Sequence, residues 1–149
     1  MAENIDDGAA VFGHLDYTLT IADLTAAATT QAVTLAGFPA DAFPLEVQVS
    51  VNEFFTGGAI TAVTLQIGDA GDPNGLMAAL NVFAVTGTDD FSVGTDGVEA
   101  EYGSTGPARE SAYAPEALFT STTDDVDAAT AGRVHIRLYY KQRLPPEVA

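Results

Sequence analysis

The sequence predicts an all-β protein, an antiparallel β-sandwich with a jelly roll as the favoured arrangement and at most one short helix. Three observations support this. Short segments alternate apolar with polar side chains, as strands with one buried face do. Glycine and proline residues separate these segments at short intervals. About seven or eight short strands result, which is typical of two packed sheets.

The first half of the chain is expected to contain two strands and a central hairpin. Alternation predicts strands over residues 14–21 and 31–35. Two prolines make residues 37–44 a loop, because proline donates no ladder hydrogen bond. Residues 45–67 then form two alternating arms about Gly57-Gly58, and glycines supply the positive φ angles of a tight turn. This stretch is therefore predicted to be a β-hairpin.

The second half is less regular before its final strand. Residues 68–75 are rich in glycine and aspartate and predict a turn region. Leu76, Leu80 and Phe83 recur at helical spacing, which predicts one or two helical turns within residues 76–85. A second hairpin is expected about Asp96-Gly97.

The closing part of the chain is expected to be a loop, a strand, a turn and a last strand. The loop covers residues 103–115, the strand residues 117–123, and an acidic turn residues 124–132. The last strand, residues 133–140, alternates most cleanly and places Val134 and every second residue after it inward.

One domain accounts for this pattern. A chain of 149 residues is long enough to bury a sizeable core, and without cysteine it has no disulfide. We expect a flexible N-terminal arm over residues 1–13, a single β-sandwich domain over residues 14–140, and an extended C-terminal tail over residues 141–149.

Charge excludes several classes of partner. The chain has 21 acidic and five basic residues, a formal net charge of -16. Such a surface repels nucleic acid and anionic membranes, so neither is an expected partner. The longest apolar run, residues 76–85, is too short to span a bilayer. The acidic N-terminus lacks the layout of a signal peptide, so we expect synthesis in a cytoplasm.

The basic residues are concentrated near the C-terminus, where four of the five follow Gly132. This polarity suggests that a basic strand and tail meet an acidic surface, either of this chain or of a partner. The simpler alternative is that the arginines pair with neighbouring strands. Adjacent aromatic residues also indicate an interface, because one ring of each pair must face outward. The predicted interface residues are Arg133, Arg137, Tyr139, Lys141, Arg143 and Phe55.

Catalysis has little support in the sequence. Cysteine is absent, and His14 and His135 both fall on the expected polar faces of strands. No motif places a serine beside either histidine. Glu99 and Glu101 would share one strand face, as a glycosidase pair could, but such pairs arise by chance in so acidic a chain. We therefore expect no enzyme and no catalytic residue.

The turn region 68–75 contains the main candidate metal site, and the loop with Asp124, Asp125 and Asp127 is a similar, weaker one. Asp69, Asp72 and Asn74 offer the oxygen ligands that calcium prefers. Their spacing departs from that of an EF-hand loop, and Pro73 interrupts it. The alternative is an Asx turn, in which carboxylates accept hydrogen bonds from free backbone amides. No other cofactor is expected.

Three stretches, residues 17–35, 57–73 and 131–140, resemble small virion proteins of tailed bacteriophages and prophages. The likeness lies in strands rich in Thr, Ala, Val and Gly. It implies a β-sandwich that is a structural part of the particle, with no catalytic residue to carry over. The implied roles are a capsid cement or decoration protein, the base of a head fibre, or a tail component.

For a cement protein, the resemblance implies that the major capsid protein is the partner and that the protein is a homo-oligomer, with a trimer favoured. The location would be the capsid surface of the virion, after synthesis in the host bacterial cytoplasm. One alternative is a head-fibre or tail-tip sandwich that binds a glycan or receptor, assisted by calcium. The other is a halophilic enzyme with an acidic surface, which would need a pocket with a perturbed titratable group.

Overall fold

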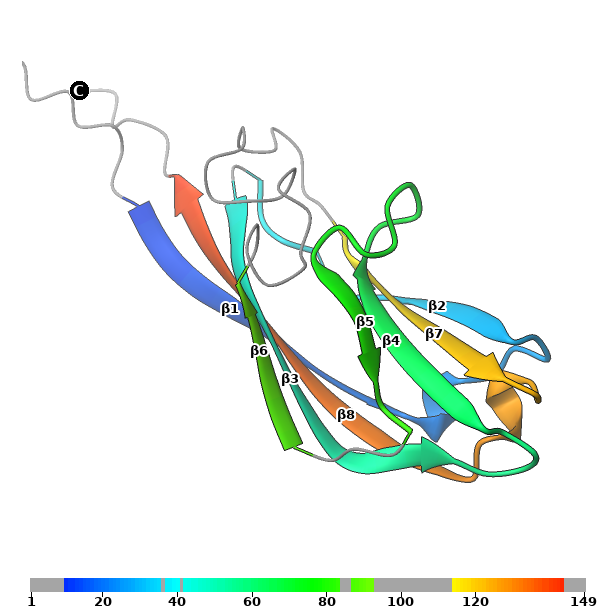
Figure 1. The fold of residues 1–149 in the computed structure, drawn as a ribbon. Helices are drawn as coiled ribbons and strands as arrows, with labels where there is room; N and C mark the ends of the chain where they lie inside the picture. Colours follow the sequence, from blue (N-terminus) through cyan, green and yellow to red (C-terminus); the bar gives the residue numbers. More distant parts are fainter. Residues whose placement is uncertain (1–9, 36, 41, 84–86, 93–113, 144–149) are drawn as a thin grey trace, which may run out of the picture.

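The computed structural model describes residues 10–35, 37–40, 42–83, 87–92 and 114–143. These residues form eight strands in two four-stranded sheets (Figure 1). The strands are β1 (Ala10–Thr20), β2 (Thr30–Thr34), β3 (Ala42–Thr56), β4 (Ala62–Gly68), β5 (Met77–Asn81), β6 (Gly87–Ser92), β7 (Glu116–Thr122) and β8 (Ala131–Arg143). Two 3-10 turns, η1 (Ile21–Asp23) and η3 (Val126–Ala128), precede β2 and β8.

The two sheets have the strand orders β1-β8-β3-β6, called sheet A, and β2-β7-β4-β5, called sheet B. All neighbours are antiparallel, so the predicted antiparallel β-sandwich is confirmed. The first strand pairs with the last, the second with the seventh, the third with the sixth, and the fourth with the fifth. This nested pairing is the arrangement found in jelly rolls.

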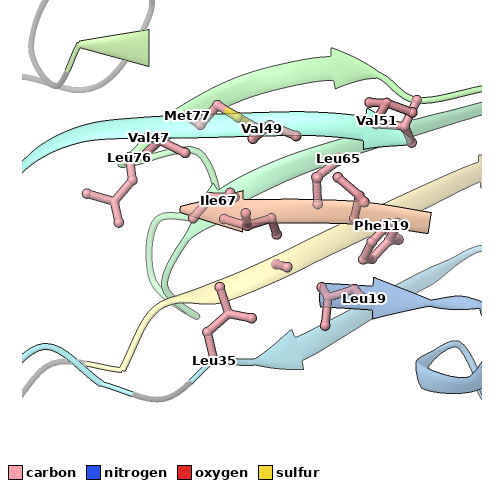
Figure 2. Close-up of a cluster of buried hydrophobic side chains, with 14 of the residues drawn as sticks. Leu19, Leu35, Val47, Val49, Val51, Leu65, Ile67, Leu76, Met77 and Phe119 are labelled. Atoms are coloured by element: carbon pink, nitrogen blue, oxygen red, sulfur yellow. The ribbon is translucent and has the colours of Figure 1, made fainter. Parts of the chain in front are cut away.

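The core lies between the sheets, where alternate side chains of each strand face inward (Figure 2). Removing each of these side chains from water contributes about 1.5–3 kcal/mol. Phe55 of β3 and Phe119 of β7 meet across the sandwich with ring centroids 5.1 Å apart. The largest fully buried side chains are Phe55, Phe119, Leu65, Ile67, Leu76, Met77, Ile136, Leu138, Val47, Val49, Val82 and Val126.

The predicted central hairpin is wrong. Both of its arms are strands, but β3 belongs to sheet A and β4 to sheet B, so they do not pair. Gly57 and Gly58 have φ angles of 143° and 54° and carry the chain from one sheet to the other. Two adjacent glycines are therefore compatible both with a hairpin turn and with a connection that crosses between sheets.

This crossing is fastened to the connection between β7 and β8. The Ala59 amide donates to a carboxylate oxygen of Asp124 at 2.9 Å, and the Thr130 amide donates to the Thr56 carbonyl at 2.8 Å. A Cβ atom on Gly57 would lie 2.4 Å from the backbone nitrogen of Thr130. The close approach requires glycine, and it closes this end of the sandwich.

The predicted helical turns within residues 76–85 are also wrong, because β5 occupies this stretch. Leu76 and Met77 are adjacent and both fully buried, which simple alternation does not allow. The ladder of β5 with β4 is irregular between Leu65 and Ile67, and this break accommodates two successive buried residues. The helical spacing of the leucines was therefore coincidental.

Several predicted boundaries move. Strands expected at 31–35, 117–123 and 133–140 are present as β2, β7 and β8. Residues 10–13, assigned to the arm, belong to β1, and residues 141–143, assigned to the tail, belong to β8. These two extensions pair with each other, from Ala10 opposite Arg143 to Gly13 opposite Tyr140. The hairpin expected about Asp96-Gly97 and the rest of the arm and tail lie outside the described residues.

Candidate functional site

Strand β8 presents the predicted basic residues on the outer face of sheet A. Val134, Ile136 and Leu138 are fully buried, so the alternate side chains must point away from the core. β8 lies between β1 and β3, which supply neighbours on both sides. The outward residues of β8 are Arg133, His135, Arg137, Tyr139 and Lys141.

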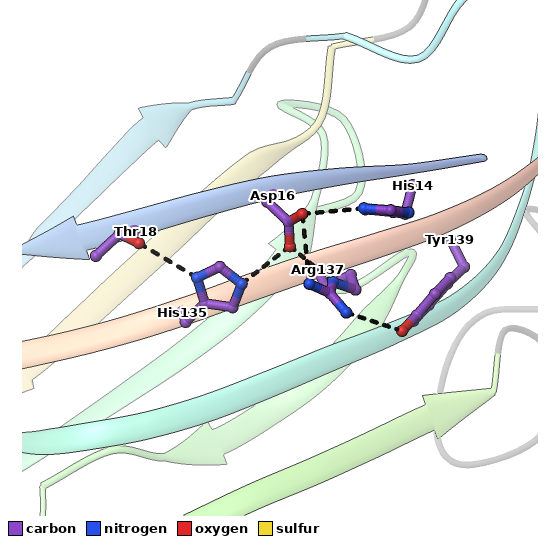
Figure 3. A network of polar contacts seen from close by, with 6 residues as sticks. All are labelled: His14, Asp16, Thr18, His135, Arg137 and Tyr139. Atoms are coloured by element: carbon purple, nitrogen blue, oxygen red, sulfur yellow. Dashed lines mark hydrogen bonds and ion pairs between the residues drawn. The ribbon is translucent and has the colours of Figure 1, made fainter.

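The carboxylate of Asp16, on β1, is the centre of a polar cluster on this face (Figure 3). Arg137 Nε donates to Asp16 Oδ1 at 2.7 Å, and His135 Nε2 lies 2.9 Å from the same oxygen. His14 Nε2 lies 3.1 Å from Asp16 Oδ2. Both histidines of the chain and one arginine thus converge on a single carboxylate.

Two further side chains extend the cluster. The Thr18 hydroxyl lies 3.2 Å from His135 Nδ1, on the side of the ring away from Asp16. The Tyr139 hydroxyl accepts from Arg137 at 3.5 Å, and its ring lies 6.0 Å from that of His14. The register explains the grouping, since His14, Asp16 and Thr18 stand opposite Tyr139, Arg137 and His135.

The electrostatics follow from these contacts. The hydrogen bond from Arg137 is the main cause that lowers the pKa of Asp16 below its ordinary value of 3.8, and His135 and His14 act in the same direction. The same bond raises the pKa of Arg137. The charge of Arg137 is therefore already compensated within the chain. This agrees with the alternative that the arginines pair with neighbouring strands.

The remaining predicted interface residues differ in their availability. Arg133 and Lys141 are exposed, and neither side chain forms an ion pair with another described residue. Tyr139 is half-buried within the cluster. Arg143 ends β8, and its side chain lies outside what the structure describes.

The prediction that Phe55 is an interface residue is wrong. Its side chain is fully buried against Phe119, and its ring covers the backbone of Gly132. The exposed member of the pair is Phe54, with 44% of its surface accessible. Bulges in β3 on either side of Glu53 disturb the alternation here, so the sequence could not decide which ring faces inward.

Sequence reasoning missed two exposed apolar residues at the start of β1. Val11 and Phe12 are 43% and 71% exposed. Small acidic residues precede them, which favours an arm. The alternation of residues 14–21 does not reach them, since Phe12 is an apolar residue at an outward position, opposite Lys141.

The candidate calcium residues lie in the connection between β4 and β5. Asp69 Oδ1 accepts from the amides of Gly71 and Asp72, both at 2.8 Å, which is the Asx turn that was the alternative. Across the described part of the chain, no three His, Cys, Asp or Glu side chains are grouped closely enough to hold a metal ion. Calcium binding stays a prediction.

Comparison with known proteins supports the fold. No protein-family model and no curated protein matches the sequence. Among solved structures, a chain of the cyanophage Pam1 capsid asymmetric unit superposes with a TM-score of 0.53 at 18% identity, over 91% of this chain and 86% of the other. A chain from the capsid of Ralstonia phage GP4 superposes with a TM-score of 0.55 at 22% identity, over 93% and 87%.

These likenesses show a shared fold over nearly the whole of each chain. A chain from the disulfide-linked pili of Bacillus endospore appendages superposes with a TM-score of 0.45 at 13% identity, over 93% of this chain and 91% of the other, which supports no inference. Within the described residues, no helix has the length and apolar character needed to cross a membrane.

Proposed function

We propose that this chain is a structural protein of a tailed-phage particle, and that it is a cement or decoration protein bound to the outside of the capsid across the joints between capsomers. The observation that carries the proposal is the fold shared, over nearly their full length, with chains from two phage capsids. The chain thus shares the architecture of components found in such particles. The major capsid protein is the proposed partner, and the virion surface the proposed location.

The physical role follows from interface added to a shell. A protein that bridges two capsomers must be released before they separate, so its binding free energy adds to the work of opening the shell. A homo-oligomer, with a trimer favoured, would bridge several capsomers at once and gain from multivalency. A net charge of -16 keeps free copies soluble before they bind.

Arg133 and Lys141 are the best-placed cations for a contact with an acidic capsid surface. Both are exposed on the outer face of β8, eight residues apart, which corresponds to about 27 Å along a strand. Arg137 is less suitable because Asp16 already holds its guanidinium. The proposed contact therefore involves the two ends of the strand rather than its centre.

Co-sedimentation with purified shells tests the proposal. We expect the wild-type chain to co-sediment and to raise the temperature at which shells open. The double variant R133Q/K141Q should bind more weakly, most clearly at low salt, where charge contacts are least screened. The variant A70E/A114E is the matched control, since it changes net charge equally at two exposed positions away from β8.

Two results would count against this function. Failure of the wild-type chain to co-sediment with shells would contradict the cement role. If the same chain also bound to a glycan array, a receptor-binding sandwich would be favoured instead. Equal loss of binding in R133Q/K141Q and A70E/A114E would reject the contact through β8 while leaving the cement role intact.

The proposal includes no catalysis and no cofactor. Thr18, His135 and Asp16 stand in the order hydroxyl, imidazole, carboxylate, as in hydrolases. However, Arg137 already compensates the carboxylate that would stabilise a protonated imidazole. We therefore expect no turnover of activated esters, and a rate that disappears in Thr18→Val would contradict this.

A further inference from the structure

Charge is distributed very unevenly between the two sheets. Within the strands of sheet B, Glu116 is the only charged residue. The strands of sheet A carry all the others that fall in strands, namely Asp16, Glu46, Glu53, Asp89, Asp90, Arg133, Arg137, Lys141 and Arg143. A chain with a net charge of -16 thus contains one sheet almost without charge.

The outer side of sheet B carries mostly uncharged side chains. Phe119 and its alternate neighbours in β7 point into the core, so Leu118 and Thr120 point outward, as does Glu116 at the start of the strand. The register places Ala32 and Gln66 on either side of Leu118, and Thr30 and Thr64 on either side of Thr120. We call the following residues the neutral face: Thr30, Ala32, Thr34, Thr64, Gln66, Leu118 and Thr120.

Among the described residues, Glu116 stands at the edge of the neutral face, opposite Thr34, and the other acidic residues near it lie in the connections at its two ends. Asp69 and Asp72 lie in the β4–β5 connection at one end, and Asp124, Asp125 and Asp127 lie in the β7–β8 connection at the other. Depletion of charge at the centre with polar residues at the rim is the composition of protein interfaces. Leu118 supplies an apolar side chain near the middle, flanked by both neighbouring strands.

We infer that the neutral face contacts a second copy of this chain. Two copies that each carry a charge of -16 repel one another over most of their surfaces. Like charges placed against each other repel strongly, so the surface on which two copies approach most easily is the one with the least charge. The inference rests on the homo-oligomer of the proposed function and names the surface that would form it.

The size of the face predicts how strong the contact is. Seven residues of β7 and the three strands of the neutral face correspond to about 24 Å by 14 Å, or roughly 340 Å² before side-chain relief is counted. A standard interface buries about 800 Å² per partner. The association should therefore be reversible in free solution and dependent on protein concentration.

Added charge on the face provides the main test, with sedimentation equilibrium as the measurement. Ala32→Glu is exposed on the edge strand β2 and should not disturb folding, and Thr120→Glu places the charge at the centre. We expect each to weaken self-association roughly ten-fold or more. Asn52→Glu adds the same charge at an exposed position of β3 in sheet A and should leave association unchanged.

Salt and a single thiol give independent readouts. Added salt shortens the Debye screening length, which is about 8 Å at physiological ionic strength, and so weakens the repulsion between acidic copies. Association should therefore strengthen as salt is added. The chain has no cysteine, so Thr120→Cys introduces one thiol. Its rate of reaction with a thiol reagent should fall as protein concentration rises, whereas that of Asn52→Cys should not.

The outcomes separate this inference from the proposed function. The inference would be overturned if the wild-type chain stayed monomeric at all concentrations, even if it bound shells. It would also be overturned if A32E associated as strongly as the control N52E. A chain that associates through the neutral face but ignores shells would overturn the cement role and leave the inference standing.

Discussion

Asp16 joins two strands that are far apart in the chain, since its partner Arg137 lies 121 residues away. Its pKa is lowered chiefly by the hydrogen bond from Arg137. A carboxyl group with a lowered folded-state pKa contributes stability that is complete above its unfolded pKa, near 3.8, and is lost as the pH falls through the lower folded value. The cluster is thus a source of acid sensitivity in the first and last strands.

Replacing this carboxylate tests the acid sensitivity. Asp16→Asn should be less stable than the wild type at pH 7, because Arg137 loses its charged partner. The difference should shrink as the pH falls below 3.8 and through the lowered folded-state pKa, because the wild-type carboxyl then becomes protonated as well. Urea unfolding at several pH values measures this, with the exposed Asp127→Asn as control. A constant difference across this range would show that the ionised form has no special role.

The sequence could predict the parts of this cluster but not the cluster. Outward positions were correctly expected for His135, Arg137 and Tyr139, because alternation alone determines the face of a strand. That β1 pairs with β8 depends on the topology of the whole chain, which local alternation does not encode. His14 and His135 therefore looked like two unrelated surface histidines.

Gly132 is a position where one added methyl group should be costly. Its φ angle is 153°, and a Cβ atom would lie 2.3 Å from the ring of Phe55. We expect Gly132→Ala to lower the free energy of unfolding by about 2–4 kcal/mol, from overpacking and backbone strain. Denaturant unfolding measures it, and Gly71→Ala in an exposed loop should cost far less.

A double-mutant cycle identifies the cause of that loss. In a Phe55→Leu background, the added methyl group meets a smaller side chain, so Gly132→Ala should cost less than in the wild type. An unchanged cost would mean that backbone conformation, rather than the Phe55 ring, requires glycine here.

At the scale of elements, the connections decide what the strands become. The β3–β4 crossing depends on Asp124, whose pKa is lowered by the hydrogen bond from the Ala59 amide and then by that from the Asp125 amide. The Ser121 hydroxyl also donates to the Asp124 carbonyl at 2.6 Å. One residue thus joins the turn after β7 to the crossing between the sheets.

Removal of this side chain should open the crossing locally. Asp124→Ala should raise the rate of hydrogen exchange at the Ala59 amide and lower the melting temperature. Asp124→Asn keeps an acceptor oxygen and should have the smaller effect. Amide exchange followed by NMR distinguishes them, and equal protection of Ala59 in all three proteins would contradict the assignment.

The sequence determined most strands but not their partners. Alternation revealed β2, β7 and β8 because each turns every second side chain toward the core. It failed at β5, where Leu76 and Met77 are buried in succession beside an irregular ladder. It also could not separate a hairpin from a crossing at Gly57, since both need the same backbone freedom.

The calcium loop is the remaining element to test. Asp69 Oδ1 accepts hydrogen bonds from two backbone amides, which occupies the oxygen that a calcium ion would use. We therefore expect calcium to leave the melting temperature nearly unchanged relative to chelator. A rise that grows with calcium concentration would indicate binding to the folded state, and its loss in Asp72→Asn would locate the site.

For the whole molecule, nested pairing makes nearly every strand contact long-range. The β1 ladder with β8 alone joins residues 10–20 to residues 133–143. Proteins dominated by such contacts refold in milliseconds to seconds. We expect refolding on this scale, followed by stopped-flow tyrosine fluorescence because tryptophan is absent. Completion within tens of microseconds would contradict it.

The partner of β1 is synthesised after all the other described strands. Ala131 follows Thr20 by 111 positions, so at the usual rate of synthesis β1 waits roughly six to twenty seconds for a partner from its own molecule. Chains that end before Ala131 lack β8, the central link between β1 and β3, and cannot complete sheet A. The topology thus withholds the finished outer face of sheet A from any chain that stops before β8.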